Sequence, residues 1–308
     1  MNRDLPLVSV IIATRNRPQL LRRAIQSVAD QTYPKIEIVV VDENDPNGEA
    51  RRQTARTIMN LSSSRPILYL SDRAPTMVCT ARNEGAAQAS GELLAFLDDD
   101  DYWKETKLAT QVHCLQQSEL GPALVYTGLE VVDSSGNTLK IRRPRHRGAI
   151  LTDLLKVNVI GTPSSVIMRR EVFNAIGGFD PALPTRHDFD LYVRVAEHHS
   201  IDFIPEPLTA YLNLQLSAMS KDYEKKLEGR RLVLEKHYGL YEKRPELLSA
   251  YYYGSALLSM KHGDRKTALQ FLRESLKAKM TVRATIRWTF TFLHFTKPQR
   301  KLEKPATE

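Results

Sequence analysis

Apolar strand-like runs alternate with helix-like segments through the first 130 residues of the chain. Residues 8–13 and 36–41 are runs rich in β-branched side chains, and residues 93–97 form another short apolar run. Between them, apolar residues recur at the three- and four-residue spacings of an amphipathic helix, as in 20–28. This order predicts an α/β fold, with a mostly parallel sheet and helices on both of its faces.

The apolar run at 93–97 ends abruptly in four consecutive aspartates, Asp98 to Asp101, which Tyr102 and Trp103 follow. Open α/β sheets bind ligands at the carboxyl ends of their strands, where these carboxylates are expected. Adjacent anions repel one another unless a cation neutralises them, and carboxylate oxygens suit Mg²⁺ or Mn²⁺. A solvated acidic loop is the alternative, but the buried-strand context favours a metal and phosphate site.

Composition and charge divide the chain into two parts. It has 308 residues, of which 42% are hydrophobic and 26% charged, and no apolar run is long enough to span a membrane. Residues 221–308 carry 20 Lys and Arg against 10 Asp and Glu, whereas residues 1–220 carry 24 against 26. We therefore predict two domains at this boundary, the second basic and helical. Cys79 and Cys114 match no metal or redox spacing, and with no signal-peptide pattern they favour a cytoplasmic protein.

Three acidic positions stand at predicted strand or helix ends: Asp42, the 98–101 run, and Asp188. In this order, they resemble the inverting nucleotide-sugar glycosyltransferases of family two, which have the GT-A fold. The resemblance covers roughly residues 5–220. Further matching stretches are Thr14-Arg-Asn-Arg-Pro18, Ala81-Arg-Asn-Glu-Gly85, Gly177-Gly-Phe-Asp180 and Asp188 to Arg194. The fold it implies is a GT-A domain over 1–220 followed by a helical extension.

The resemblance implies which residues hold the nucleotide. Thr14 and Asn16 lie in the first strand-to-helix loop, where the family holds it. Asp42 matches the acid that recognises the base, and Arg82 matches the basic residue that helps. The usual second acid after the Asp42 position is here Glu43, and the loop that follows it is unusual, so base specificity follows less directly than the fold.

The same resemblance implies the catalytic and metal-binding residues. Asp98 and Asp100 match the outer positions of the family's Asp-x-Asp motif. Asp100 is expected to ligate the metal directly, and Asp98 is a second ligand nearer the ribose and sugar. Asp99 is assigned to nucleotide-sugar binding, and Asp188 matches the catalytic base. His187 stands where the family usually has an acid, and it either orients Asp188 or is a surface histidine.

The function implied is a metal-dependent inverting glycosyltransferase of the hexosyltransferase type. It would move one sugar from a nucleoside-diphosphate sugar, with a UDP-sugar as the expected donor, to a glycan or lipid-linked acceptor in cell-surface polysaccharide synthesis. Two alternatives stay open. A sugar nucleotidyltransferase would want a Gly-rich loop after the first strand, which residues 14–18 lack. A nucleotide-sugar-binding scaffold would have lost catalysis.

The basic C-terminal part indicates an anionic partner, for which we expect a membrane surface on the cytoplasmic side and no nucleic acid. On a helical wheel of residues 282–295, one polar stripe is formed by Arg283, Arg287, Thr291 and His294. Trp288, Phe290, Phe292, Leu293 and Phe295 occupy much of the remainder, and Lys297, Arg300, Lys301 and Lys304 follow. This is the pattern of an interfacial helix. A strand, or a helix packed on the main domain, is the alternative.

Overall fold

Strand β1 (Val8–Thr14) lies between β2 (Ile36–Asp42) and β4 (Leu93–Phe96) in the computed structural model, and β3 (Ile67–Leu70) extends β2 on its far side. All three pairings are parallel, as the alternation predicted. Parallel strands need crossover connections, which helices α1 (Pro18–Ala29), α2 (Glu49–Met59) and α3 (Val78–Gln88) provide. The structure describes residues 5–61, 65–72, 74–212 and 222–295. It divides into two compact units, residues 1–220 and 221–308.

The second half of the sheet is mixed. Strand β8 (Val166–Arg169) pairs antiparallel with β4 and with β6 (Leu124–Val132), and β6 pairs parallel with the long strand β9 (Ile201–Leu212). Strands β5 (Tyr102–Trp103) and β7 (Thr138–Arg142) add antiparallel edges to β9 and β6. Within the described residues, nine strands thus form one sheet. The α/β fold class is confirmed, with the parallel order holding in the first half of the sheet.

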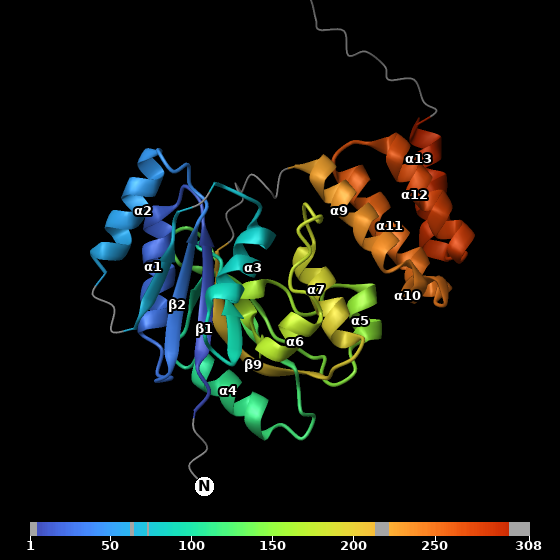
Figure 1. Cartoon of the computed structure of the whole chain (residues 1–308). Helices are drawn as coiled ribbons and strands as arrows, with labels where there is room; N and C mark the ends of the chain where they lie inside the picture. The colour runs from blue at the N-terminus through green and yellow to red at the C-terminus, as the bar shows by residue number, and fades with distance from the viewer. Residues whose placement is uncertain (1–4, 62–64, 73, 213–221, 296–308) are drawn as a thin grey trace, which may run out of the picture. The chain divides into compact units, whose positions relative to one another are not determined.

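Helices cover both faces of the parallel strands, and Figure 1 shows α1 (Pro18–Ala29) and α3 (Val78–Gln88) on opposite sides of β1 and β2. Alternate residues of β1 face the two layers because strand side chains alternate. Val8, Val10 and Ile12 pack in one core cluster with the buried side of α1. The other helices of this unit are α2 (Glu49–Met59), α4 (Lys107–Gln117), α5 (Leu151–Lys156), α6 (Arg170–Ala175) and α7 (His187–Ala196).

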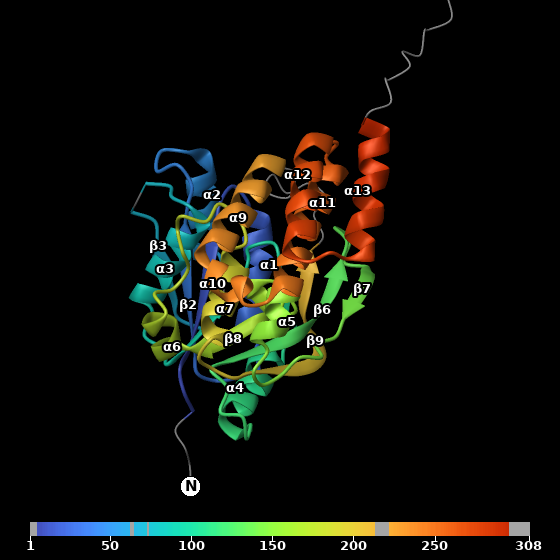
Figure 2. The ribbon, with the colours of Figure 1, turned by 90° about the vertical axis from the view of Figure 1, so that its right-hand side faces the viewer.

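The second unit is helical over its described residues, as its sequence predicted. Figure 2 shows α11, α12 and α13 side by side, and Asp222 and Asp264 cap α9 and α12 by accepting hydrogen bonds from backbone N–H groups. In the described part of the chain, no helix meets the length and hydropathy needed to cross a membrane. The helices are α9 (Tyr223–Lys236), α10 (Tyr238–Glu242), α11 (Pro245–Lys261), α12 (Arg265–Ala278) and α13 (Val282–Phe295).

Helix α3 approaches the sheet closely at Gly85. A Cβ atom at this position would lie 2.6 Å from a methyl carbon of Ile11 and 2.9 Å from one of Val41. Both neighbours are buried in strands, so neither can move away cheaply.

We predict that Gly85→Ala destabilises the protein by about 1–3 kcal/mol, because it overpacks this contact. Chemical unfolding followed by circular dichroism measures the change. Gly239→Ala is the control, because it adds the same methyl group to helix α10 where no atom lies within 4 Å. A Gly85→Ala protein as stable as the control protein would contradict the predicted overpacking.

Candidate active site

The residues that the sequence singled out meet at one edge of the sheet. Thr14 ends β1 and is the register partner of Asp42, which ends β2. Asp98 follows β4 after one more residue, and β4 is parallel to β1. Because the carboxyl ends of parallel strands lie at the same edge, the loops that carry these side chains converge there.

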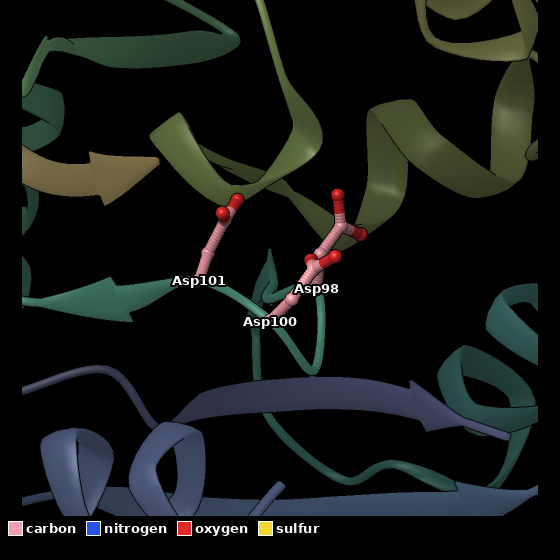
Figure 3. Close-up of side chains that lie close together, drawn as sticks. All are labelled: Asp98, Asp100 and Asp101. Carbon is pink, nitrogen blue, oxygen red and sulfur yellow. The ribbon is translucent and has the colours of Figure 1, made fainter. Parts of the chain in front are cut away.

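Three of the four consecutive aspartates form an acidic cluster. One carboxylate oxygen from each of Asp98, Asp100 and Asp101 lies within 4.8 Å of the other two. Figure 3 shows the three side chains leaving the same loop toward the same side. Hard divalent cations bind such sets of oxygens, so these residues fit Mg²⁺ or Mn²⁺. The structure adds Asp101 to the two ligands expected from the sequence.

Asp101 differs from the other two because the protein already satisfies it. It is fully buried, and its two carboxylate oxygens accept hydrogen bonds from Ser164 Oγ at 2.6 Å and from the backbone N–H of Leu212 at 3.0 Å. Burial, together with the charges of Asp98 and Asp100, raises its pKa well above the usual range. Asp98 and Asp100 therefore remain the better candidates for direct metal ligation.

Two arginines neutralise the exposed part of the cluster. Arg17 Nη1 donates to Asp99 Oδ1 at 3.0 Å and to Asp100 Oδ2 at 2.7 Å. Arg82, a buried residue of α3, is paired through Nη2 with Asp98 Oδ1. Even so, burial and the neighbouring carboxylates Asp98 and Asp99 raise the pKa of Asp100 to about 6. A further cation beside Asp100 would stabilise the charged form of its carboxyl group.

Thr14 and Asn16, the two residues of the first loop expected to bind the nucleotide, lie in different environments. The Thr14 hydroxyl donates to Asp99 Oδ2 at 2.8 Å and is buried, so it supports the aspartate loop. Asn16 is exposed and has a φ of 58°, the left-handed conformation that asparagine tolerates. Its backbone N–H donates to Asn44 Oδ1 at 2.7 Å. This turn directs the next residue, Arg17, toward the aspartates.

Asp42 lies inside the protein and is fully engaged. It accepts from the Tyr69 hydroxyl and from the backbone N–H of Asn44, and Arg51 Nε lies 3.3 Å from its Oδ2. Its exposure is 0%, so a base would contact this carboxylate only after one of these groups moved. Arg82, expected near the base, instead contacts Asp98 and His187.

The expected catalytic base Asp188 lies in the first turn of α7. This helix begins directly after Arg186, which has the left-handed conformation with φ 63°. Asn158 Nδ2 donates to Asp188 Oδ2 at 3.1 Å. Asn158 is itself fixed, because its Oδ1 accepts the backbone N–H of Gly161 at 2.9 Å. The neighbouring Asp190 is buried and paired with Arg194 at 2.6 Å, so it holds the helix.

His187 is half-buried, and its ring is directed toward Arg82. Its Nε2 lies 2.9 Å from Arg82 Nη1, and its Nδ1 is buried without a hydrogen-bond partner among the described residues. Burial and the charge of Arg82 lower the pKa of His187 to about 4. The ring is therefore neutral at ordinary pH, and Nε2 accepts from the guanidinium. His187 orients Arg82, and through Arg82 it connects to Asp98.

Sequence reasoning missed several of these contacts. Asn158 and Ser164 lie in no matching stretch, Arg17 lies in one without an assigned role, and each bonds a residue at least 30 positions away. Thr162 belongs to the same group, since its hydroxyl donates to Asp98 Oδ2 at 3.3 Å. No local pattern in the sequence reports such pairings.

Comparison with protein families identifies the chain. Residues 9–177, more than half of it, match the family model described as Glycosyl transferase family 2. The chain belongs to glycosyl transferase family 2. The family resemblance read from the sequence is therefore confirmed.

Two relatives illustrate the family 2 match. An uncharacterized glycosyltransferase of Rickettsia felis is 32% identical over 205 residues, which cover 64% of this chain and 33% of the relative. The putative teichuronic acid biosynthesis glycosyltransferase TuaG of Bacillus subtilis is 29% identical over 166 residues, covering 54% and 64%. The chain thus spans about a third of the length of the Rickettsia felis relative and under two thirds of TuaG.

Solved structures share the fold. S. aureus TarS 1–349 has a TM-score of 0.65 at 16% identity and covers 91% of this chain and 82% of its own, and it has also been solved with UDP-GlcNAc. The mannosyltransferase PcManGT from Pyrobaculum calidifontis, in complex with GDP-Man and Mn²⁺, has a TM-score of 0.57 at 18% identity and covers 95% and 81%. At these identities the likeness shows the fold alone.

The lowered pKa of His187 predicts how the free energy of unfolding changes with pH. An unfolded histidine titrates near pH 6.5, so between about pH 6.5 and 4 the unfolded state binds more protons than the folded state. The contribution of His187 to the free energy of unfolding is therefore complete above pH 6.5 and is lost as the pH falls through this window. His187→Gln should remove about 2 kcal/mol of this pH dependence, measured by urea unfolding at pH 7.0 and 4.5.

The control is His113→Gln, which changes an exposed histidine of α4 and should leave the pH dependence of the wild-type protein unchanged. Parallel stability curves for wild type and His187→Gln would show that His187 is not held neutral by its surroundings.

Proposed function

We propose that the chain is a metal-dependent inverting glycosyltransferase that transfers one sugar from a nucleoside-diphosphate sugar to a glycan or lipid-linked acceptor. The observation that carries the proposal is the presence of two neighbouring sets of polar contacts, one around Asp98 and one around Asp188. Arg82 bridges Asp98 and His187, Thr162 bonds Asp98, and Asn158 bonds Asp188. The two sets are adjacent along the chain, because His187 precedes Asp188, and Gly161, which Asn158 bonds, precedes Thr162.

The metal would be held by Asp98 and Asp100, with Asp101 beside them. The fit rests on the chemistry of the oxygens, which lie within 4.8 Å of one another, and on the raised pKa of Asp100, which burial leaves short of countercharge. When bound, a divalent cation supplies charge stabilisation for the diphosphate leaving group. The PcManGT complex with Mn²⁺ supports this assignment for the fold.

Asp188 acts as the general base. An acceptor hydroxyl must lose its proton as it attacks the anomeric carbon, and a carboxylate within hydrogen-bond distance accepts it. Attack on the face opposite the leaving group, in one displacement, inverts the anomeric carbon. Asn158 keeps the Asp188 carboxylate oriented for this transfer, since its amide donates to one oxygen and leaves the other for the acceptor.

The donor is proposed to be a UDP-sugar. TarS, which shares the fold, was solved with UDP-GlcNAc, and PcManGT with GDP-Man, so the fold accepts both bases. Asp42 is the proposed base-recognition residue, and the Tyr69 hydroxyl that covers it would have to turn away on binding. Cell-surface polysaccharide synthesis is the proposed setting, because TuaG is a putative teichuronic acid biosynthesis enzyme.

We predict that Asp188→Asn abolishes sugar transfer, because it keeps the shape of the side chain and removes its basicity. Donor binding should survive: a UDP-sugar with Mn²⁺ should raise the melting temperature of the variant as much as that of wild type. Asp100→Ala should instead lose the Mn²⁺-dependent part of this shift and lower turnover by about a thousandfold.

Asp190→Asn is no suitable control, since Asp190 is paired inside α7. Asp153→Asn is a suitable control, because Asp153 is partly exposed on α5 and lies outside the contacts around Asp98 and Asp188. Full transfer by Asp188→Asn would contradict the role of Asp188 as general base. Full activity of wild type in excess chelator would contradict the metal dependence.

The C-terminal unit is proposed to attach peripherally to an anionic membrane. On α13, Val282 and Ile286 are 74% and 65% exposed, and Arg283 and Arg287 are exposed beside them. Exposed apolar and basic side chains on one helix fit an interface with anionic lipid. Residues 282–295 are helical, so the strand alternative for them is wrong.

The predicted polar stripe is only partly exposed. Thr291 is buried at 4% exposure and its hydroxyl lies 3.9 Å from Met260 Sδ, and Ala284 on the same side is fully buried. The helix therefore packs on its own unit with one side. The basic residues Lys297, Arg300, Lys301 and Lys304 lie outside the described residues.

We predict that Arg283→Glu with Arg287→Glu weakens binding to phosphatidylglycerol vesicles by about tenfold or more at low salt, since each basic residue near an anionic surface contributes about 1 kcal/mol. Cosedimentation measures the binding. Substitution is a sharper test than deletion of 281–308, because deletion would uncover the surface of its own unit on which α13 packs. Leu139→Asp, at an exposed apolar position of the other unit, is the control. Equal vesicle binding by all three proteins would show that α13 is not the anchor.

A further inference from the structure

The guanidinium group of Arg17 lies against the Asp100 carboxylate. One nitrogen, Nη1, lies 2.7 Å from Asp100 Oδ2 and 3.0 Å from Asp99 Oδ1. The guanidinium side chain is 33% exposed, while the Asp99 and Asp100 side chains are 7% and 18% exposed. Arg17 thus covers the two carboxylates from the solvent side and shares one donor group between them.

The two contacts of Arg17 are not equivalent. Asp99 has a second donor, the Thr14 hydroxyl at 2.8 Å, and is buried in the loop. Asp100 receives its only side-chain hydrogen bond among the described residues from Arg17. Loss of the Asp100 contact would leave Arg17 anchored on Asp99, whereas loss of the Asp99 contact would leave a buried carboxylate short of a donor.

Local backbone geometry holds Arg17 in place. The left-handed turn at Asn16 precedes it, and Pro18, the first residue of α1, follows it with a fixed φ. Arg23, one and a half turns further along α1, donates to the backbone oxygen of Asp100 at 2.7 Å. Helix α1 therefore contacts Asp100 twice, but only Arg17 contacts its carboxylate.

We propose that Arg17 is a built-in counterion of Asp100 that a divalent cation displaces, so that Arg17 sets the metal affinity of the site. This inference rests on the proposed metal-dependent function. Without metal, the guanidinium balances the carboxylate charge. When the cation binds, the Asp100 oxygen exchanges partners, and Arg17 stays on Asp99. Its positive charge a few ångströms away opposes the cation, because like charges at this distance repel even near a protein surface.

The test is Mn²⁺ binding without nucleotide, measured at pH 8 by the electron paramagnetic resonance signal of free Mn²⁺. Arg17→Gln removes the charge and keeps a donor of similar reach. It should bind Mn²⁺ at least about tenfold more tightly than wild type. Arg17→Lys keeps the charge and should stay within about threefold of wild type. Arg23→Gln is the matched control, since it also removes a positive charge near Asp100 but Arg23 bonds only the backbone oxygen of that residue, and it should raise the affinity by clearly less than Arg17→Gln does.

A thermal-shift series separates this role from a purely structural one. Arg17→Gln should melt lower than wild type without metal and show a larger upward shift with saturating Mn²⁺. If Arg17→Gln does not fold, Arg17→Met replaces it in both measurements. Unchanged or weaker Mn²⁺ binding in the neutral variant, with normal binding in wild type, overturns the counterion role and leaves the proposed function standing. No Mn²⁺ binding by any variant, while a UDP-sugar still binds, overturns the metal dependence and this inference with it.

Discussion

The charge of the aspartate loop is the constraint on which the rest of the site depends. Four carboxyl groups on consecutive residues, Asp98 to Asp101, cannot be brought into a partly buried loop without countercharge, because their mutual repulsion grows as water is removed. The fold supplies two guanidinium groups from different elements, Arg17 at the start of α1 and Arg82 within α3. Helices from both faces of the sheet must therefore reach the same loop.

The four aspartates alternate in role because they alternate in environment. Asp99 and Asp101 are 5% and 0% exposed, and protein donors satisfy their oxygens. The side chains of Asp98 and Asp100 are 27% and 18% exposed. The buried pair fixes the loop, and the more exposed pair is left to meet a ligand. The outer positions of an Asp-x-Asp pattern are suited to a cation for this reason, and Asp99 between them holds the loop.

Features that depend on local sequence patterns could be predicted, whereas features that depend on contacts between distant residues could not. The parallel strands and the position of Asp98 at a strand end follow from the run at 93–97 and the helices that flank it. Strand β6 (Leu124–Val132) was not foreseen, because Thr127 and Gly128 interrupt its apolar run and its partners β8 and β9 lie far along the chain. The inward turn of His187 depends on Arg82, 105 residues earlier, so no local signal reports it.

The charge balance of the site is tied to the packing of the core. Arg82 lies one turn before Gly85 on α3, and a Cβ atom at position 85 would lie within 3 Å of both Ile11 and Val41. A side chain at position 85 would push the helix off the sheet and move the guanidinium away from Asp98. The absence of a side chain at Gly85 thus allows a buried arginine to reach the strand ends. A substitution far from any ligand can then alter the electrostatics of the aspartate loop through helix position alone, because a packed core transmits small displacements instead of absorbing them.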